Sequence, residues 1–136
     1  MNSASLAHET NTAPGRAALW TGRILSGLVA ALLVMSAVAK LGGGPEVEAG
    51  FAQAGFKPEH LAPIGVVEIA CVVLYLVPWT AFLGAILLTG FLGGAVVTHL
   101  RLDDAVHMPI LVGVVVWLGL FLRDPRLRRL APLRSL

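Results

Sequence analysis

Residues 61–98 read LAPIGVVEIACVVLYLVPWTAFLGAILLTGFLGGAVVT, and this stretch decides the fold of the chain. It contains two apolar runs, residues 61–77 and 79–98, and its only charged side chain is Glu68. Each run has about the length that an α-helix needs to cross a bilayer, roughly 20 residues. Pro78 stands between the runs and leaves almost no loop, so we expect an antiparallel helical hairpin.

Two further apolar runs flank this hairpin. Residues 17–41 precede it, with Arg23 near their start. Residues 105–122 follow it, with Pro109 in the first turns, where proline is tolerated best. The sequence therefore predicts an all-α fold, an antiparallel four-helix transmembrane bundle with spans at about 17–41, 61–77, 79–98 and 105–122.

The composition indicates that lipid covers much of this apolar surface. Hydrophobic types make up 57% of the 136 residues and charged types 13%, whereas a soluble domain carries roughly 25% charged residues. The mean hydropathy is +0.82, and a water-soluble chain this short cannot bury so much apolar surface in one core. We expect a single membrane domain over residues 16–136, preceded by a polar, disordered tail at residues 1–15.

The first apolar run has a second interpretation. Ala37-Val38-Ala39 resembles a signal-peptidase site, and an apolar stretch precedes it. The polar region before that stretch is 23 residues long, which is long for a signal peptide. We therefore expect an uncleaved first span, and a mature form beginning at Lys40 is the alternative.

The loop at residues 41–60 contains a helical pattern of its own. Val47, Phe51, Ala54 and Phe56 recur at a spacing that places them near one face of a helix. This pattern predicts a short amphipathic helix between the first two spans, lying at the membrane interface.

Basic residues predict the orientation in the membrane. Five of the ten Lys and Arg residues fall in the last 14 positions, beside the fourth apolar run. The positive-inside rule then predicts that both termini face the cytoplasm, N-in and C-in. Because topology explains the basic end, nucleic acid is not an expected partner, whereas the lipid bilayer is. Eight arginines against two lysines are typical of a GC-rich bacterial gene, which suggests the bacterial cytoplasmic (inner) membrane.

Small residues are concentrated in the third apolar run. Ala85, Thr89 and Gly93 recur at steps of four, and Gly90 with Gly94 forms a G-x-x-x-G motif. Such a surface lets helix backbones approach closely in lipid. We expect it to pack inside the bundle, and an interface in a homo-oligomer or with a membrane protein partner is the alternative.

Ionisable side chains at membrane depth are costly unless paired or hydrated, so each marks a candidate site. Lys40 ends the first span, Glu68 lies seven residues into the second, and His99 and Arg101 end the third. The predicted topology brings these four toward one layer of the outer leaflet, where they form the candidate ligand-binding set. We expect Glu68 to pair with Lys40 or Arg101, and a pair that only fixes helix register is the structural alternative.

The set has one geometric condition. On an ideal helix His99 and Arg101 point about 200° apart, so both face one pocket only if the helix unwinds after Thr98.

Two kinds of chemistry are not expected. Cys71 is the only cysteine, which excludes an internal disulfide and argues against a self-contained thiol oxidoreductase. Glu59, His60 and His107 have no metal-ligand spacing, so no metal site is expected. No residue pair in the sequence can accept and pass on electrons, so a redox role requires a bound quinone or a partner.

Four segments at the ends of the apolar runs carry a resemblance to a known family. They are Ser36-x-x-x-Lys40-Leu41, Gly65-x-x-Glu68, Gly93-Gly94-Ala95-x-x-Thr98-His99-Leu100-Arg101 and Trp117-x-Gly119-Leu120-x-Leu122-Arg123-Asp124-Pro125-x-Leu127-Arg128. In order and spacing they resemble the DoxX-like family of small four-helix bacterial membrane proteins, over about residues 17–134. The resemblance implies that Lys40, Glu68, His99 and Arg101 occupy the polar positions of the family pattern.

This resemblance implies a fold but fixes no chemistry. The family is named for a relative in a thiosulfate:quinone oxidoreductase, and other relatives are linked to membrane redox or to chaperoning. The leading hypothesis is a protein that binds a lipidic or quinone-like molecule in its outer half, as a subunit of a membrane redox system. A non-catalytic scaffold or assembly factor is the alternative. A small transporter is a third, weakened because four spans leave little room for alternating access.

Overall fold

The computed structural model describes residues 15–130. Over these residues the chain forms helices and no strand, so the all-α prediction is confirmed. Residues 1–14 of the predicted tail and residues 131–136 of the basic end lie outside the described residues. The elements are α1 (Arg16–Gly42), α2 (Pro45–Gln53), the 3₁₀ helix η1 (Pro58–His60), α3 (Leu61–Leu76), α4 (Ala81–Arg101), α5 (His107–Arg123) and α6 (Pro125–Leu130).

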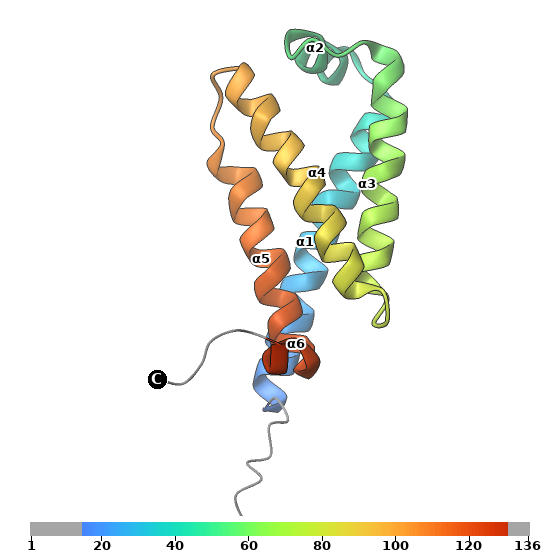
Figure 1. The fold of residues 1–136 in the computed structure, drawn as a ribbon. Helices are drawn as coiled ribbons and strands as arrows, with labels where there is room; N and C mark the ends of the chain where they lie inside the picture. The colour runs from blue at the N-terminus through green and yellow to red at the C-terminus, as the bar shows by residue number, and fades with distance from the viewer. Residues whose placement is uncertain (1–14, 131–136) are drawn as a thin grey trace, which may run out of the picture.

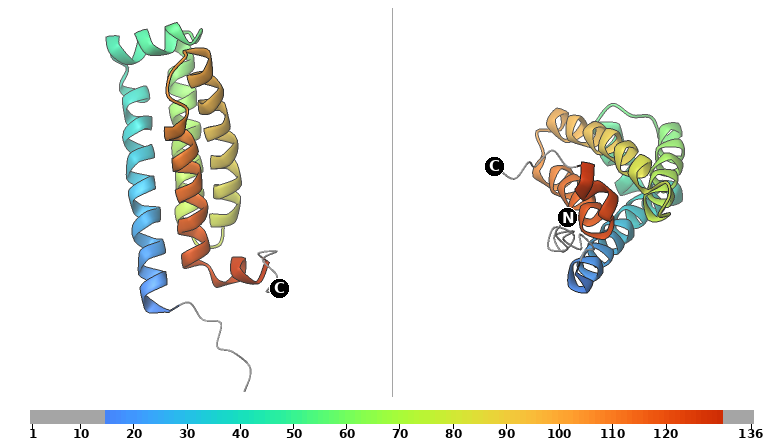
Figure 2. Two further views of the ribbon diagram at one scale, coloured as in Figure 1. Left: turned by 90° about the vertical axis from the view of Figure 1, so that its left-hand side faces the viewer. Right: turned by 60° about the horizontal axis from the view of Figure 1, so that its bottom comes forward.

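Four long helices, α1, α3, α4 and α5, lie side by side, and each runs opposite to the one before it (Figure 1). Both α1 and α4 pack against α3 and against α5, so the four helices form a closed ring. At one end of the bundle lie α2 and the turn after Arg101, and we call this the α2 end (Figure 2). At the other end lie Arg16, the turn after Leu76 and α6, and we call this the α6 end.

Three of the four long helices have the length and apolarity to cross a membrane. They contain 27, 19 and 21 residues, at Arg16–Gly42, Pro58–Leu76 and Ala81–Arg101. The fourth, α5, has 17 residues, or about 26 Å at 1.5 Å per residue, slightly less than a hydrocarbon core of about 30 Å. The predicted fourth span over α5 therefore stays a prediction.

Apolar side chains cover the outside of the bundle as well as its inside. The core contains Leu33, Val72, Leu88, Val116 and Leu120, all of them buried. Large apolar side chains are also exposed on every long helix, among them Leu28, Met35, Val67, Ile86, Val114 and Leu118. Exposed apolar surface on this scale marks a site of contact with other molecules, and around a ring of long helices that contact is with lipid.

The predicted hairpin is formed by α3 and α4. Thr80 Oγ1 donates a hydrogen bond to Leu74 O at 2.8 Å, which satisfies one carbonyl near the end of α3. Gly84 packs directly against the backbone of Tyr75, and a Cβ at position 84 would lie 2.6 Å from Leu74 C. Because only glycine permits this approach, Gly84 sets the spacing between the two helices.

The end of α4 differs from its expected boundary at Thr98. The helix continues to Arg101, and the chain then turns at Asp103, whose φ is 56°. The N–H of Asp104 donates to His99 O at 2.9 Å, which completes a left-handed C-terminal cap. Since the helix does not unwind after Thr98, the condition for His99 and Arg101 to face one pocket is not met.

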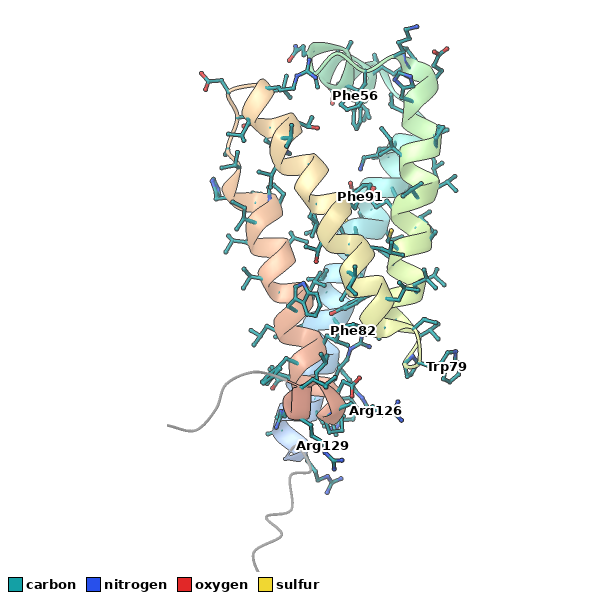
Figure 3. The ribbon with its side chains drawn as sticks, viewed as in Figure 1. Phe56, Trp79, Phe82, Phe91, Arg126 and Arg129 are labelled. Carbon is teal, nitrogen blue, oxygen red and sulfur yellow. The ribbon has the colours of Figure 1, made fainter. Side chains whose placement is uncertain are left out.

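A short helix, α2, is present between α1 and α3, as predicted. The rings of Phe51 and Phe56 pack with their centroids 5.6 Å apart, and Phe56 lies on the side of α2 that faces the bundle (Figure 3). Ala54, between them in the sequence, is buried. Phe51 of α2 and the apolar residues just after the helix thus pack together at the α2 end.

The small-residue surface of α4 divides into two parts. Ala85 is fully buried in the core. Thr89 Oγ1 lies near the outside and accepts a hydrogen bond from Trp117 Nε1 of α5 at 2.9 Å. These two positions therefore contribute to packing within the bundle.

The other part consists of Gly90, Gly93 and Gly94, which are exposed. A Cβ at any of these three positions would meet no atom within 4 Å. The expectation of packing inside the bundle is therefore wrong for them. The interior face of α4 in this region is formed instead by Leu88 and Leu92, which turns the glycines outward.

Candidate functional site

A buried ion pair lies toward the α2 end of the bundle. Lys40 is in the last turn of α1, and its Nζ donates to Glu68 Oε2 of α3 at 2.7 Å. Lys40 Nζ also donates to Ser36 Oγ, one helical turn earlier. The exposed fractions of the Lys40 and Glu68 side chains are 12% and 1%. The prediction that Glu68 pairs with Lys40 or Arg101 is confirmed, and the partner is Lys40.

Close packing of α1 against α3 brings the two charges together. Gly65 lies one turn before Glu68 on the same side of α3. A Cβ at position 65 would lie 3.1 Å from Ala37 O and 3.0 Å from Leu41 Cγ, both on α1. A larger residue would push α1 away, so Gly65 sets the separation that Lys40 and Glu68 bridge.

The pair retains hydrogen-bonding capacity. An ammonium group has three donors, and two of those on Lys40 are used by Ser36 and Glu68. The Glu68 carboxylate accepts through Oε2, which leaves Oε1 to accept another hydrogen. The ring of Phe91 on α4 lies 6.0 Å from Lys40 Nζ, so an aromatic face borders the charged groups (Figure 3). Lys40 therefore keeps one further donor near an aromatic ring, and Glu68 keeps one further acceptor.

The other two candidate residues do not join this pair. His99 Nδ1 contacts Ala95 O of its own helix at 2.8 Å, and His99 Nε2 lies 4.0 Å from Asp104 Oδ2. The Arg101 guanidinium lies instead beside the loop, where a Cβ on Gly55 would be 3.3 Å from Arg101 Nη2. The four candidate residues thus form one buried pair and two separate residues at the end of α4.

A second polar cluster, which the sequence analysis did not identify, lies nearer the α6 end. Tyr75 is fully buried on α3, and its hydroxyl donates to Val116 O of α5 at 2.8 Å. Ser26 Oγ of α1 lies 2.9 Å from the same hydroxyl. Because the tyrosine proton is given to Val116 O, the serine is the donor to Tyr75. Three helices are therefore joined through one phenol group.

Glycines allow this cluster to form. A Cβ at Gly119 would lie 2.8 Å from Ser26 Oγ and 3.2 Å from the Tyr75 hydroxyl. A Cβ at Gly22 would lie 2.8 Å from Gly119 O, so the backbones of α1 and α5 are almost in contact. The only sequence signal for the cluster was the presence of single polar residues, Ser26 and Tyr75, within apolar runs.

Arg123, at the end of α5, extends the cluster toward the α6 end. Its guanidinium donates to Tyr75 O through Nη2 and lies 4.6 Å from the centroid of the Tyr75 ring. Its Nε is buried and has no hydrogen-bond partner among the described residues. The side chain is thus held at a fixed place with part of its donor capacity unused.

A comparison with protein families identifies the family of this chain. A family model described as DoxX-like matches residues 24–121, well over half of the chain. The chain belongs to the DoxX-like family. The resemblance inferred from the sequence is confirmed, and DoxX-like membership together with the long apolar helices fits an integral membrane protein. None of the curated proteins and none of the solved structures matches the chain.

The DoxX-like match includes both Lys40 and Glu68, and also Ser26 and Tyr75 of the second cluster. It ends before Arg123, so the arginines at the α6 end lie outside the DoxX-like match. Within residues 15–130, no group of three His, Cys, Asp or Glu side chains could hold a metal ion. Within the helices that the structure describes, the buried polar groups of this DoxX-like chain include the Lys40–Glu68 ion pair and the Tyr75 network.

Proposed function

We propose that this membrane protein binds the polar head of a lipidic molecule, a quinone being the leading candidate, against Lys40 and Glu68. The observation that carries the proposal is the unused capacity of the pair, one ammonium donor and one carboxylate oxygen beside the ring of Phe91. A quinone head is flat and carries carbonyl oxygens, which accept hydrogen bonds from an ammonium group. Its reduced form carries hydroxyls, which donate to a carboxylate.

Membrane depth strengthens this argument. A buried pair surrounded by apolar side chains interacts more strongly with a polar ligand than an exposed pair does, because water does not compete. The chain contains no residue pair that accepts and passes on electrons, so its part in a redox system is to bind and orient the quinone for a partner subunit. The proposal therefore describes a binding subunit, and the electron transfer belongs to the partner.

A non-catalytic scaffold is the second candidate, and one observation favours it. The pair is complete without any ligand, since Glu68 is 1% exposed and already accepts from Lys40 at 2.7 Å. Such a pair fixes the register of α1 against α3 by itself. In this case the protein assembles other membrane proteins, and the ion pair has no ligand to bind.

Ligand retention separates the two candidates. The full chain is extracted from a quinone-containing membrane in mild detergent, and the molecules that copurify are identified by mass spectrometry. We expect a quinone or other lipidic molecule in the wild type, and at least about a tenfold loss of retention in Glu68→Gln, which is nearly isosteric. The matched control is Tyr75→Phe on the same helix, which removes a polar group and leaves the ion pair intact.

The result that supports the scaffold is equally specific. If the wild type retains no such molecule and added short-chain benzoquinone does not raise its melting temperature, the binding function is rejected. Equal losses of retention in Glu68→Gln and Tyr75→Phe, in step with their melting temperatures, would also reject it, because retention would then follow stability alone.

We further propose that the α6 end faces the cytoplasm of a bacterial inner membrane, N-in and C-in. What supports this is the arginine distribution, since six arginines lie at or near that end, namely Arg16, Arg23, Arg123, Arg126, Arg128 and Arg129. A reporter fused after residue 136 should be active only if it is a cytoplasmic reporter. A reporter inserted near Gly44 should be active only if it is a periplasmic one, and the reverse pattern would overturn the orientation.

A further inference from the structure

A cavity of about 300 Å³ lies at the α6 end, the opposite end from the Lys40–Glu68 pair. It lies among the start of α1, the turn after α3 and the junction of α5 with α6. Apolar and charged side chains line it, including Leu120, Trp79, Arg23, Arg123, Asp124 and Arg126. Neither the proposed quinone site nor the family match accounts for this cavity.

The cavity has an excess of positive charge. Three guanidinium groups, those of Arg23, Arg123 and Arg126, face one carboxylate, that of Asp124. Among residues 15–130 none of these arginines lies within 4.0 Å of a carboxylate oxygen. Asp124 Oδ1 instead accepts from the backbone N–H of Arg126 at 2.9 Å, at the start of α6. The charge of the three arginines is therefore not neutralised by ion pairs within the described part of the chain.

Arg123 is the fixed element of this site. Its guanidinium is held by Tyr75 O and by the face of the Tyr75 ring, 4.6 Å away. Its Nε is the one buried side-chain nitrogen or oxygen without a hydrogen-bond partner in residues 15–130. A buried donor without a partner is unfavourable, and an oxygen that accepts from it removes this cost. Guanidinium groups bind phosphate oxygens with particularly good geometry, because their donors form a planar fork.

The position of the cavity indicates which kind of phosphate-bearing molecule it binds. Trp79 is 84% exposed at the turn between the end of α3 and the start of α4, a location typical of the membrane–water interface. The phosphate of a phospholipid lies at this depth, and basic pockets between transmembrane helices bind anionic headgroups. Leu19 and Trp79 give the cavity an apolar part that acyl chains can contact. We propose that this cavity binds the phosphate of an anionic phospholipid.

Arg23 and Arg126 are suitable for a test, because both side chains are exposed and neither makes a side-chain hydrogen bond to another helix in the described residues. The double variant Arg23→Gln/Arg126→Gln removes two of the three charges and leaves Arg123 in place. The matched control is Arg16→Gln/Arg129→Gln, which removes two charges at the same end that do not line the cavity. Figure 3 shows Arg126 and Arg129 together on α6.

The experiment measures binding of phosphatidylglycerol to the full chain by native mass spectrometry in a neutral detergent. Phosphatidylcholine and inorganic phosphate are tested beside it. We expect tighter binding of phosphatidylglycerol than of phosphatidylcholine. We also expect about a thirtyfold loss of affinity in Arg23→Gln/Arg126→Gln, since each arginine near an anionic lipid surface contributes about a factor of five. The control variant should lose less than about threefold.

Each other outcome overturns the proposal. Equal losses in the two double variants would mean that lipid is attracted by the whole basic end and not by the cavity. Equal binding of phosphatidylglycerol and phosphatidylcholine would exclude recognition of negative charge. Stabilisation by inorganic phosphate as large as that by phosphatidylglycerol would assign the cavity to a free anion. The melting temperature of each variant without lipid is recorded as well, and we expect it to equal that of the wild type.

Discussion

The two ends of the bundle hold polar groups together in different ways. Toward the α2 end, Lys40 and Glu68 join two helices through opposite charges. Toward the α6 end, the hydroxyl of Tyr75 joins three helices through uncharged hydrogen bonds, to Ser26 and to Val116 O. The first arrangement depends on two charged atoms, and the second on helix backbones that almost touch.

This difference indicates where stability and ligand binding are located. Gly22, Gly84 and Gly119 bring helix backbones into close contact in the half of the bundle nearer the α6 end. The ion pair has only Gly65 as a comparable contact and keeps unused donor and acceptor positions. We therefore expect substitutions in the tightly packed half to have the larger effect on the free energy of unfolding. The half with the ion pair should tolerate changes in side-chain shape better. Four sets of substitutions test this comparison.

The largest effect is expected at the closest backbone contact. In Gly84→Ala the new Cβ would overlap the backbone of Tyr75, which is not free to move away. We expect a loss of about 5 kcal/mol in the free energy of unfolding, at the upper end for single substitutions, so little folded protein should accumulate. Size-exclusion chromatography and thermal unfolding in detergent measure this.

The matched control for that substitution is Gly90→Ala on the same helix. No atom lies within 4 Å of its Cβ position, so Gly90→Ala should be neutral or stabilise α4 by up to about 1 kcal/mol. Equal stability of the two variants would mean that α3 and α4 do not approach closely at Gly84, and the comparison between the two halves would fail.

The next effect is expected at the ion pair. Glu68→Ala leaves the Lys40 ammonium buried without a counter-charge, which typically costs about 3–5 kcal/mol. Glu68→Gln should be milder, because its amide oxygen still accepts from Lys40. Lys40→Met/Glu68→Leu should restore most of the loss, since removing both charges is often nearly neutral. Thermal unfolding in detergent compares these three variants with the wild type, and an unchanged melting temperature in Glu68→Ala would exclude a structural pair.

Much of the fold could be predicted from the apolar runs, but the rotation of the helices could not. Pro78 between two apolar runs is sufficient to predict the hairpin of α3 and α4. The G-x-x-x-G motif of Gly90 and Gly94 pointed to the wrong face, because helix rotation depends on how all four helices pack. Gly84 and Gly119 make the close contacts instead, and neither stands in a motif that marks it.

The candidate site was also predictable only in part. Glu68 is the only charge in its run, so a cation at the same depth had to be its partner, and Lys40 was one of two choices. His99 and Arg101 were grouped with this pair because they end α4, but the cap at Asp103 lets the helix continue and separates them. The Tyr75 cluster gave little signal, since one of its acceptors is a backbone carbonyl, which any residue type supplies.

A smaller effect is expected in the phenol network. Tyr75→Phe keeps the ring that fills the core and removes the hydroxyl that joins α1 to α5. Hydrogen bonds between transmembrane helices contribute about 0.6 kcal/mol on average and up to about 1.7 kcal/mol, and this substitution removes two of them. We expect a loss of about 1–2 kcal/mol in the free energy of unfolding. A loss larger than that of Glu68→Ala would reverse the comparison, because the uncharged network would then be the stronger of the two.

The smallest effect is expected at the hydrogen bond between Trp117 and Thr89, which lies on the outside of the bundle. Trp117 Nε1 donates to Thr89 Oγ1 at 2.9 Å, and the Trp117 ring packs edge-on against Phe82 at 5.9 Å. Trp117→Phe and Thr89→Val each remove the hydrogen bond. Their coupling energy in a double-mutant cycle should be about 0.6 kcal/mol, because an indole facing lipid finds other acceptors when the helices separate.

The position of this bond makes the small value informative. No close glycine contact accompanies it, since a Cβ at Gly90, Gly93 or Gly94 would meet no atom within 4 Å. A coupling energy near 0.6 kcal/mol would show that an uncharged hydrogen bond alone adds little in this protein, and that the greater effect of Tyr75 comes from the close packing around it. A coupling energy above about 1.7 kcal/mol would instead mean that contacts on the outer surface of the bundle hold α4 strongly to α5. The tightly packed half would then not be the only part that determines folding.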